Sequence, residues 1–210
     1  MTQKGTRVSA SILYIHGLNS SPASLKARQL SAAMQRMGLA DRLRVPELHH
    51  HPRQAIAQLQ AAIAALGGAP LLVGSSLGGY YATHLAERLG LKALLINPAV
   101  NPHKLFDGFL GPQANHYTGD TWDLTLDHIH ALAELEVEPP QSAERFEVWL
   151  QTGDETLDYR QAQRFYQACD VRVEAGGDHG FQGFAERLAQ LFEYAGIARS
   201  AWEGIDFAAP

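Results

Sequence analysis

Short apolar stretches alternate with longer amphipathic segments along most of the chain. The apolar stretches cover residues 12–15, 43–45, 71–73, 93–96, 147–151 and 171–173. The segments between them repeat apolar residues at a spacing of three and four, and they cover residues 24–37, 54–66, 76–89, 159–168 and 181–194. This alternation is typical of parallel strands joined by helices. It predicts a single domain over residues 1–210, an α/β fold with a doubly wound, mostly parallel six-stranded sheet and helices on both faces.

The alternation stops between residues 99 and 145. This stretch is rich in proline and glycine, and its one clear helical pattern covers residues 126–135. Unpatterned segments of this length are uncommon in compact domains unless they form lids or binding segments. Because the stretch follows the fourth strand, it starts at the edge where parallel strands end and where ligands bind. We expect a lid-like insertion over that edge, and the alternative is a surface excursion without a function.

Composition narrows the functional classes. The chain is 46% hydrophobic and 19% charged with a formal net charge of −5, so it has no basic footprint for nucleic acid. Cys169 is the single cysteine, which excludes an internal disulfide and a multi-cysteine metal site. The sequence has no signal-peptide pattern and no apolar run near the roughly 18 residues of a membrane span. We therefore expect a cytoplasmic protein without a membrane span; its oligomeric state is not indicated.

The third predicted strand runs directly into a G-x-S-x-G motif formed by Gly74, Ser76 and Gly78. In this motif the serine lies on a strained turn between a strand and a helix, so that its hydroxyl projects above the sheet. The flanking glycines are required because the backbone folds back on itself and leaves no room for a Cβ. The motif lacks the lysine of a phosphate-binding loop and the G-x-G-x-x-G spacing of a dinucleotide site. Ser76 is therefore predicted to be a nucleophile, the alternative being a plain connecting turn.

An activated serine needs a histidine base and a carboxylate that orients the base. With this motif the chain order is serine, acid, histidine. His179 follows the last predicted strand and Asp154 follows the fifth, which places both at the edge that carries Ser76. We predict Ser76, Asp154 and His179 as a catalytic triad. The alternatives for the acid are its neighbours Glu155, Asp158 and Asp178.

Two backbone N–H groups are expected to bind the oxyanion that forms during the reaction. One belongs to Leu77, directly after the nucleophile. The other is predicted at Leu18, because the preceding Gly17 lets the loop after the first strand turn towards the site. The alternative for this loop is a simple turn that ends the strand.

Aromatic residues are predicted to line the substrate pocket. Phe106 and Phe109 come from the insertion and would suit an ester rather than a charged peptide. Tyr80 is the candidate from the helix after Ser76, although the sequence does not decide between it and Tyr81. The three consecutive histidines, residues 49–51, predict a loop that borders the pocket, because three successive side chains rarely converge on one metal ion. No metal and no cofactor are expected.

The ordered motifs of the chain resemble those of the α/β-hydrolase superfamily, and within it the small bacterial YqiA-type esterases. The resemblance spans about residues 11 to 195 and implies a compact hydrolase that acts on carboxylic esters and acyl-CoA thioesters. It also implies the same triad. One departure is the histidine run, which stands where such relatives carry a loop with proline and tyrosine. The motifs that carry the resemblance are His16-Gly17, Gly74-Ser75-Ser76-Leu77-Gly78-Gly79, Asn97-Pro98, Gly153-Asp154-Glu155 and Gly176-Gly177-Asp178-His179.

The sequence thus predicts a serine esterase that hydrolyses a small-molecule ester or thioester through an acyl-enzyme intermediate. Two alternatives stay open, because a fold does not dictate its substrate. The same triad supports elimination or carbon–carbon hydrolysis, and the fold can serve as a binding module without turnover.

Overall fold

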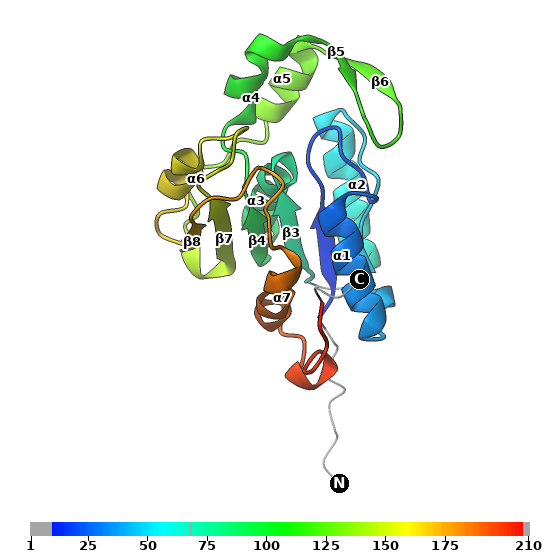
Figure 1. Cartoon of the computed structure of the whole chain (residues 1–210). Helices are drawn as coiled ribbons and strands as arrows, with labels where there is room; N and C mark the ends of the chain where they lie inside the picture. The colour runs from blue at the N-terminus through cyan, green and yellow to red at the C-terminus, as the bar shows by residue number, and fades with distance from the viewer. Residues whose placement is uncertain (1–9, 68, 208–210) are drawn as a thin grey trace.

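The computed structural model describes residues 10–67 and 69–207. Its central sheet has six parallel strands, each corresponding to a predicted one. The chain runs outward from β1 to β2 and then from β3 to β8 on the other side, so the strand order reverses between β1 and β3. In spatial order the strands are β2 (Leu43–Arg44), β1 (Ile12–Ile15), β3 (Leu71–Ser75), β4 (Ala93–Ile96), β7 (Phe146–Gln151) and β8 (Asp170–Glu174), as Figure 1 shows.

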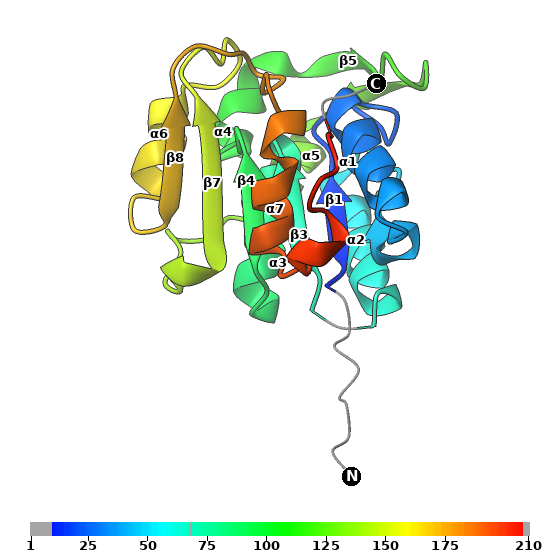
Figure 2. The same cartoon turned by 60° about the horizontal axis from the view of Figure 1, so that its bottom comes forward.

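Helices cover both faces of the sheet, as predicted. Successive strand residues point to opposite faces, so Ile12 and Tyr14 belong to one buried cluster while Leu13 and Ile15 belong to the other. This is why the strands are almost uniformly apolar rather than alternating. One face is covered by α1 (Leu25–Arg36) and α7 (Leu188–Tyr194), seen in front in Figure 2. The opposite face is covered by α2 (Pro52–Ala65), α3 (Leu77–Leu89) and α6 (Tyr159–Phe165).

The insertion between β4 and β7 is folded into regular elements. It begins with α4 (Pro102–Leu105) and continues through an antiparallel hairpin, β5 (Gly111–Ala114) and β6 (Thr121–Leu124), to α5 (Leu126–Ala133). These elements lie together beyond the carboxyl ends of the parallel strands (Figure 1). The helix agrees with the predicted one, whereas the hairpin was not predicted, because glycine and proline obscure the short alternation of its strands.

The last predicted helix is shorter than expected. Residues 181–194 were expected to be helical throughout, but α7 begins only at Leu188, after a 3₁₀ turn over Ala185–Arg187. The reason lies in the backbone, because Phe181 and Gly183 have φ values of 62° and 74°, which no right-handed helix accommodates. None of the helices in the described part of the chain is long and apolar enough to cross a membrane.

Candidate active site

Ser76 lies on a tight turn between β3 and α3. Its φ and ψ are 56° and −123°, a conformation that non-glycine residues adopt only under strain. The turn requires Gly74 and Gly78, because a Cβ on Gly78 would overlap the Ile15 carbonyl and one on Gly74 would overlap the Gly78 carbonyl. The structure therefore supplies the strained strand-to-helix turn that the G-x-S-x-G motif predicts.

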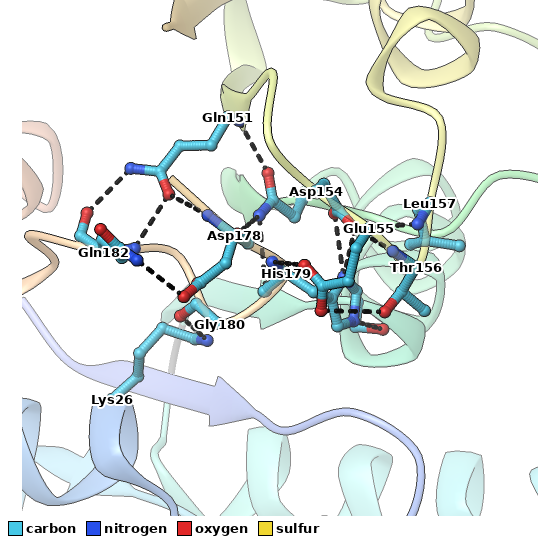
Figure 3. Close-up of polar contacts among 12 residues, drawn as sticks. Lys26, Gln151, Asp154, Glu155, Thr156, Leu157, Asp178, His179, Gly180 and Gln182 are labelled. Carbon is cyan, nitrogen blue, oxygen red and sulfur yellow. Dashed lines mark hydrogen bonds and ion pairs between the residues drawn. The ribbon is translucent and has the colours of Figure 1, made fainter. Parts of the chain in front are cut away.

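The three residues of the predicted triad are within hydrogen-bond distance of one another. The Oγ of Ser76 is 3.0 Å from Nε2 of His179. On the other side of the ring, Nδ1 of His179 is 2.9 Å from both carboxylate oxygens of Asp154 (Figure 3). The histidine can therefore take a proton from the serine on one side while it donates to the carboxylate on the other.

Backbone amides hold the Asp154 carboxylate in place. The side chain is only 1% exposed, and its Oδ1 accepts the N–H groups of Thr156 at 2.9 Å and Leu157 at 2.8 Å. These two donors come from the turn that follows β7, so the loop itself orients the carboxylate towards His179. Of the alternative acids, Asp158 caps α6 by accepting the N–H of Arg160, and Asp178 makes no contact with the His179 ring among its hydrogen bonds in the described structure.

Two buried amide side chains connect the His179 loop to the sheet. Asn97, at the end of β4, donates from Nδ2 to the Asp178 carbonyl and accepts the N–H of Gln151 on Oδ1, both at 3.0 Å. Gln151, at the end of β7, accepts the N–H groups of Asp178 and Gln182 on Oε1 at 3.2 and 2.9 Å (Figure 3). These two roles were not predicted from the sequence, although each of two adjacent strands carries an amide residue at its carboxyl end.

Two charged side chains hold the same loop from outside. Glu155 accepts the backbone N–H of His179 on Oε2 at 2.9 Å, and this hydrogen bond lowers the pKa of the Glu155 carboxyl. Lys26, on α1, donates from Nζ to the Gly180 carbonyl at 2.6 Å (Figure 3). Burial lowers the pKa of Lys26 to about 8. Glu155, one of the alternative acids, thus contacts the backbone of the histidine and not its ring.

The loop after β1 and the start of α3 meet beside Ser76. A Cβ on Gly17 would lie 3.1 Å from the Ser76 Cβ and 3.6 Å from its Oγ, so any larger residue at this position would crowd Ser76. Leu18 and Leu77, the two residues predicted to supply oxyanion donors, both line a cavity of about 490 Å³ at this point. The cavity lies where the strand order reverses, the usual place for a ligand in an open α/β sheet.

The cavity walls differ from those predicted. Tyr80, Phe106 and Phe109 do not line it. Tyr80 is 5% exposed and donates its hydroxyl to the Leu132 carbonyl at 2.7 Å, while Phe109 is 65% exposed and Phe106 packs on the core. One position further along α3, Tyr81 faces the cavity instead. The opposite walls come from Glu47, Leu48, His49 and His50 after β2 and from Asp120, Thr121 and Trp122 of the hairpin.

The histidine run borders the cavity and contacts the insertion. The N–H of Thr125 reaches Nδ1 of His128 at 3.2 Å, so Nε2 of His128 carries the proton and donates to Nδ1 of His50 at 3.0 Å. His50 also stacks on Trp122, and His51 contacts Asp127 at 2.8 Å. Burial and the neighbouring histidines lower the pKa of His50 to about 4. Among the described residues no group of three or more His, Cys, Asp or Glu side chains is arranged to hold a metal ion.

Comparison with known proteins places this fold among the α/β hydrolases. Residues 11–196 match the model of a family described as "Uncharacterised protein family (UPF0227)". A protein from Agrobacterium vitis S4 superposes with a TM-score of 0.72 at 15% identity, covering 90% of this chain and 88% of the other. Alpha/beta hydrolase domain-containing protein 10 from mouse gives 0.67 at 15% identity, with 87% and 88% covered. Est1E from Butyrivibrio proteoclasticus, with ferulic acid bound, gives 0.64 at 13% identity, with 89% and 86% covered.

Proposed function

Given that the chain belongs to the family UPF0227 and has the α/β-hydrolase fold, we propose that it is a serine hydrolase acting on carboxylic esters and thioesters. The observation that carries this proposal is the continuous contact from Ser76 through His179 to Asp154, with distances of 3.0 and 2.9 Å. A buried carboxylate, an oriented imidazole and a serine on a strained turn form the arrangement that activates a hydroxyl for acyl transfer.

The proposed reaction has two halves. Ser76 Oγ attacks the carbonyl carbon while Nε2 of His179 takes its proton, and Asp154 stabilises the resulting imidazolium. The N–H groups of Leu18 and Leu77 bind the negative oxygen of the tetrahedral intermediate. His179 then protonates the leaving alcohol or thiol as the bond to it breaks. In the second half, His179 removes a proton from water, which attacks the acyl-enzyme. His179 then returns this proton to Ser76 Oγ as the bond to the acyl carbon breaks and the acid is released. The residues named suffice for every step, and no cofactor takes part.

The size and position of the cavity support a small-molecule substrate. A volume of about 490 Å³ lies within the range of small-ligand pockets, and the cavity opens next to the two proposed oxyanion donors. The esterase domain of a Rhodothermus marinus protein is among the solved structures of similar fold. Elimination or carbon–carbon hydrolysis would use the same triad, and no feature of the described site favours either over ester cleavage.

A fluorophosphonate probe tests the proposal directly, because it reacts covalently with an activated serine. We expect intact-mass analysis to show one adduct on the wild type and none on Ser76→Ala. Ser75→Ala is the matched control, since Ser75 precedes the nucleophile but is buried in β3, and it should keep the adduct. A panel of esters and thioesters then measures turnover. A folded wild type that gives no adduct, or an adduct that persists in Ser76→Ala, would contradict the proposal and favour a binding module.

A further inference from the structure

The cavity next to Leu77 is lined by apolar side chains and by two carboxylates. Leu18, Leu77 and Tyr81 belong to its lining, whereas Ser76, which directly precedes Leu77, does not. Glu47, on the loop after β2, and Asp120, at the start of the hairpin's second strand, contribute carboxylates from the two segments that form the walls. Both carboxylate residues are exposed at the surface, so a ligand in the cavity can reach them.

Among residues 10–67 and 69–207, no lysine or arginine side chain pairs with these two carboxylates. Within the described structure, no lysine or arginine lines the cavity, and no hydrogen bond or ion pair reaches the Glu47 carboxylate. Among the described residues, the Asp120 carboxylate accepts a hydrogen bond only from the Thr118 hydroxyl, at 2.7 Å, which is an uncharged group. Partial burial and the nearby Asp120 charge raise the pKa of Glu47. His50, whose pKa is lowered to about 4, is neutral at pH 7 and adds no positive charge.

Resting on the proposed hydrolase function, we propose that this cavity binds a cationic group of the substrate, an ammonium or trimethylammonium on a short apolar linker. With the ester carbonyl at Ser76, the linker lies against Leu18 and Leu77 and the cation lies between Glu47 and Asp120. The indole of Trp122, which also lines the cavity, offers a second favourable surface for a cation. A negatively charged group on the same linker is repelled by the two carboxylates.

The test compares esters that differ only in charge. A choline ester is paired with its neutral isostere, in which a tert-butyl group replaces trimethylammonium. A second pair carries the same two groups on the acyl side of a chromogenic ester, and a carboxylate-bearing ester of equal length completes the set. At low ionic strength we expect kcat/KM to be about 10-fold higher for the cationic member of at least one pair, and the anionic ester to be the poorest substrate. Added salt should reduce the preference.

Substitutions test whether the two carboxylates cause the preference for the cationic ester. We expect the double variant Glu47→Gln/Asp120→Asn to reduce the ratio of kcat/KM between the cationic and the neutral ester to less than about threefold. Asp123→Asn is the matched control, because Asp123 lies on the same hairpin and is exposed but does not line the cavity. It should keep the full preference. A wild type that does not prefer the cation, or a preference that survives in the double variant, overturns this inference alone. A wild type that hydrolyses no ester and takes no fluorophosphonate overturns the proposed function and the inference together.

Discussion

Replacing Asp154 with asparagine tests the proposed triad more sharply than deleting it. The N–H groups of Thr156 and Leu157 both point at the position of Oδ1, so the asparagine amide must place its oxygen there. Its NH₂ group then takes the place of Oδ2, 2.9 Å from Nδ1 of His179. Because NH₂ is a donor, Nδ1 must accept, and the ring proton moves to Nε2. The histidine then faces Ser76 with a proton in place of a lone pair.

The size of the effect follows from this inverted tautomer. When the catalytic histidine is held in the wrong tautomer, kcat falls by a factor on the order of 10⁴. This corresponds to an increase of about 5.4 kcal/mol in the activation free energy, at 1.36 kcal/mol per tenfold. The free energy of unfolding should change far less, because the asparagine oxygen still accepts hydrogen bonds from both backbone amides. We expect it to fall by about 1–2 kcal/mol, since the hydrogen bonds to an uncharged oxygen are weaker. Activity and stability therefore separate clearly in this variant.

The assay is the hydrolysis of a chromogenic acetate ester together with a urea unfolding curve. Asp178→Asn is the control, because Asp178 lies beside the histidine and its carboxylate accepts from Gln182 at 2.9 Å rather than from the His179 ring. It should keep activity within about threefold of the wild type. If Asp154→Asn were to retain a tenth or more of the wild-type kcat, the assignment of Asp154 as the orienting acid would be wrong.

Other variants probe the turn, the loop, the histidine cluster and the cysteine. Gly78→Ala should yield mostly unfolded protein in a circular-dichroism measurement, because its methyl group overlaps a backbone carbonyl of the first strand; a folded product would contradict the packing argument. Asn97→Ala should lower the free energy of unfolding by about 1–3 kcal/mol for each buried partner it leaves unsatisfied, read from urea unfolding, and unchanged stability would refute this. Because the pKa values of His50 and His128 are lowered in the fold, the unfolded chain binds more protons below about pH 6.5 and stability falls with falling pH. The melting temperature of the wild type should therefore drop between pH 7 and pH 5, and that of His128→Gln should drop less. An equal drop in the two proteins would show that His128 does not contribute to the pH dependence. Burial raises the pKa of Cys169 to about 11, so iodoacetamide at pH 7 should modify it only after unfolding, as mass analysis would show.

The strands of the sheet and the proximity of Ser76, Asp154 and His179 could be predicted from the sequence. The strands are read from local apolar runs, and the turn at Ser76 depends on glycines two residues away. Asp154 and His179 each come after a parallel strand, and parallel strands end at one edge of the sheet. Their positions in the chain therefore predict that both lie near Ser76. Both predictions thus need only local sequence patterns and the rule that parallel strands end at the same edge of a sheet.

The pocket could not be predicted because its walls depend on contacts between distant segments. Trp122 donates from Nε1 to Asn19 at 2.9 Å, although 103 residues separate them. His50 and His128 lie 78 residues apart in the chain. No local pattern encodes such a pairing, and the hairpin that brings Trp122 into place was itself not predicted. The choice between Tyr80 and Tyr81 likewise depends on where α5 packs, since Tyr80 is held by the Leu132 carbonyl.

The connection between β4 and β7 determines which segment of this chain can be exchanged for the corresponding segment of a relative. These two strands are parallel neighbours in the sheet, with Ala93 opposite Phe146, so the chain leaves β4 at the carboxyl edge of the sheet and returns to the opposite edge at the start of β7. Ser76, Asp154 and His179 all lie outside the insertion. The insertion can therefore be exchanged for that of a relative without moving these three residues, provided that its partners outside the insertion are exchanged as well. These partners include Asn19, His50, His51, Arg53 and Tyr80. Such a chimera would combine the proposed triad of one protein with the cavity wall of another.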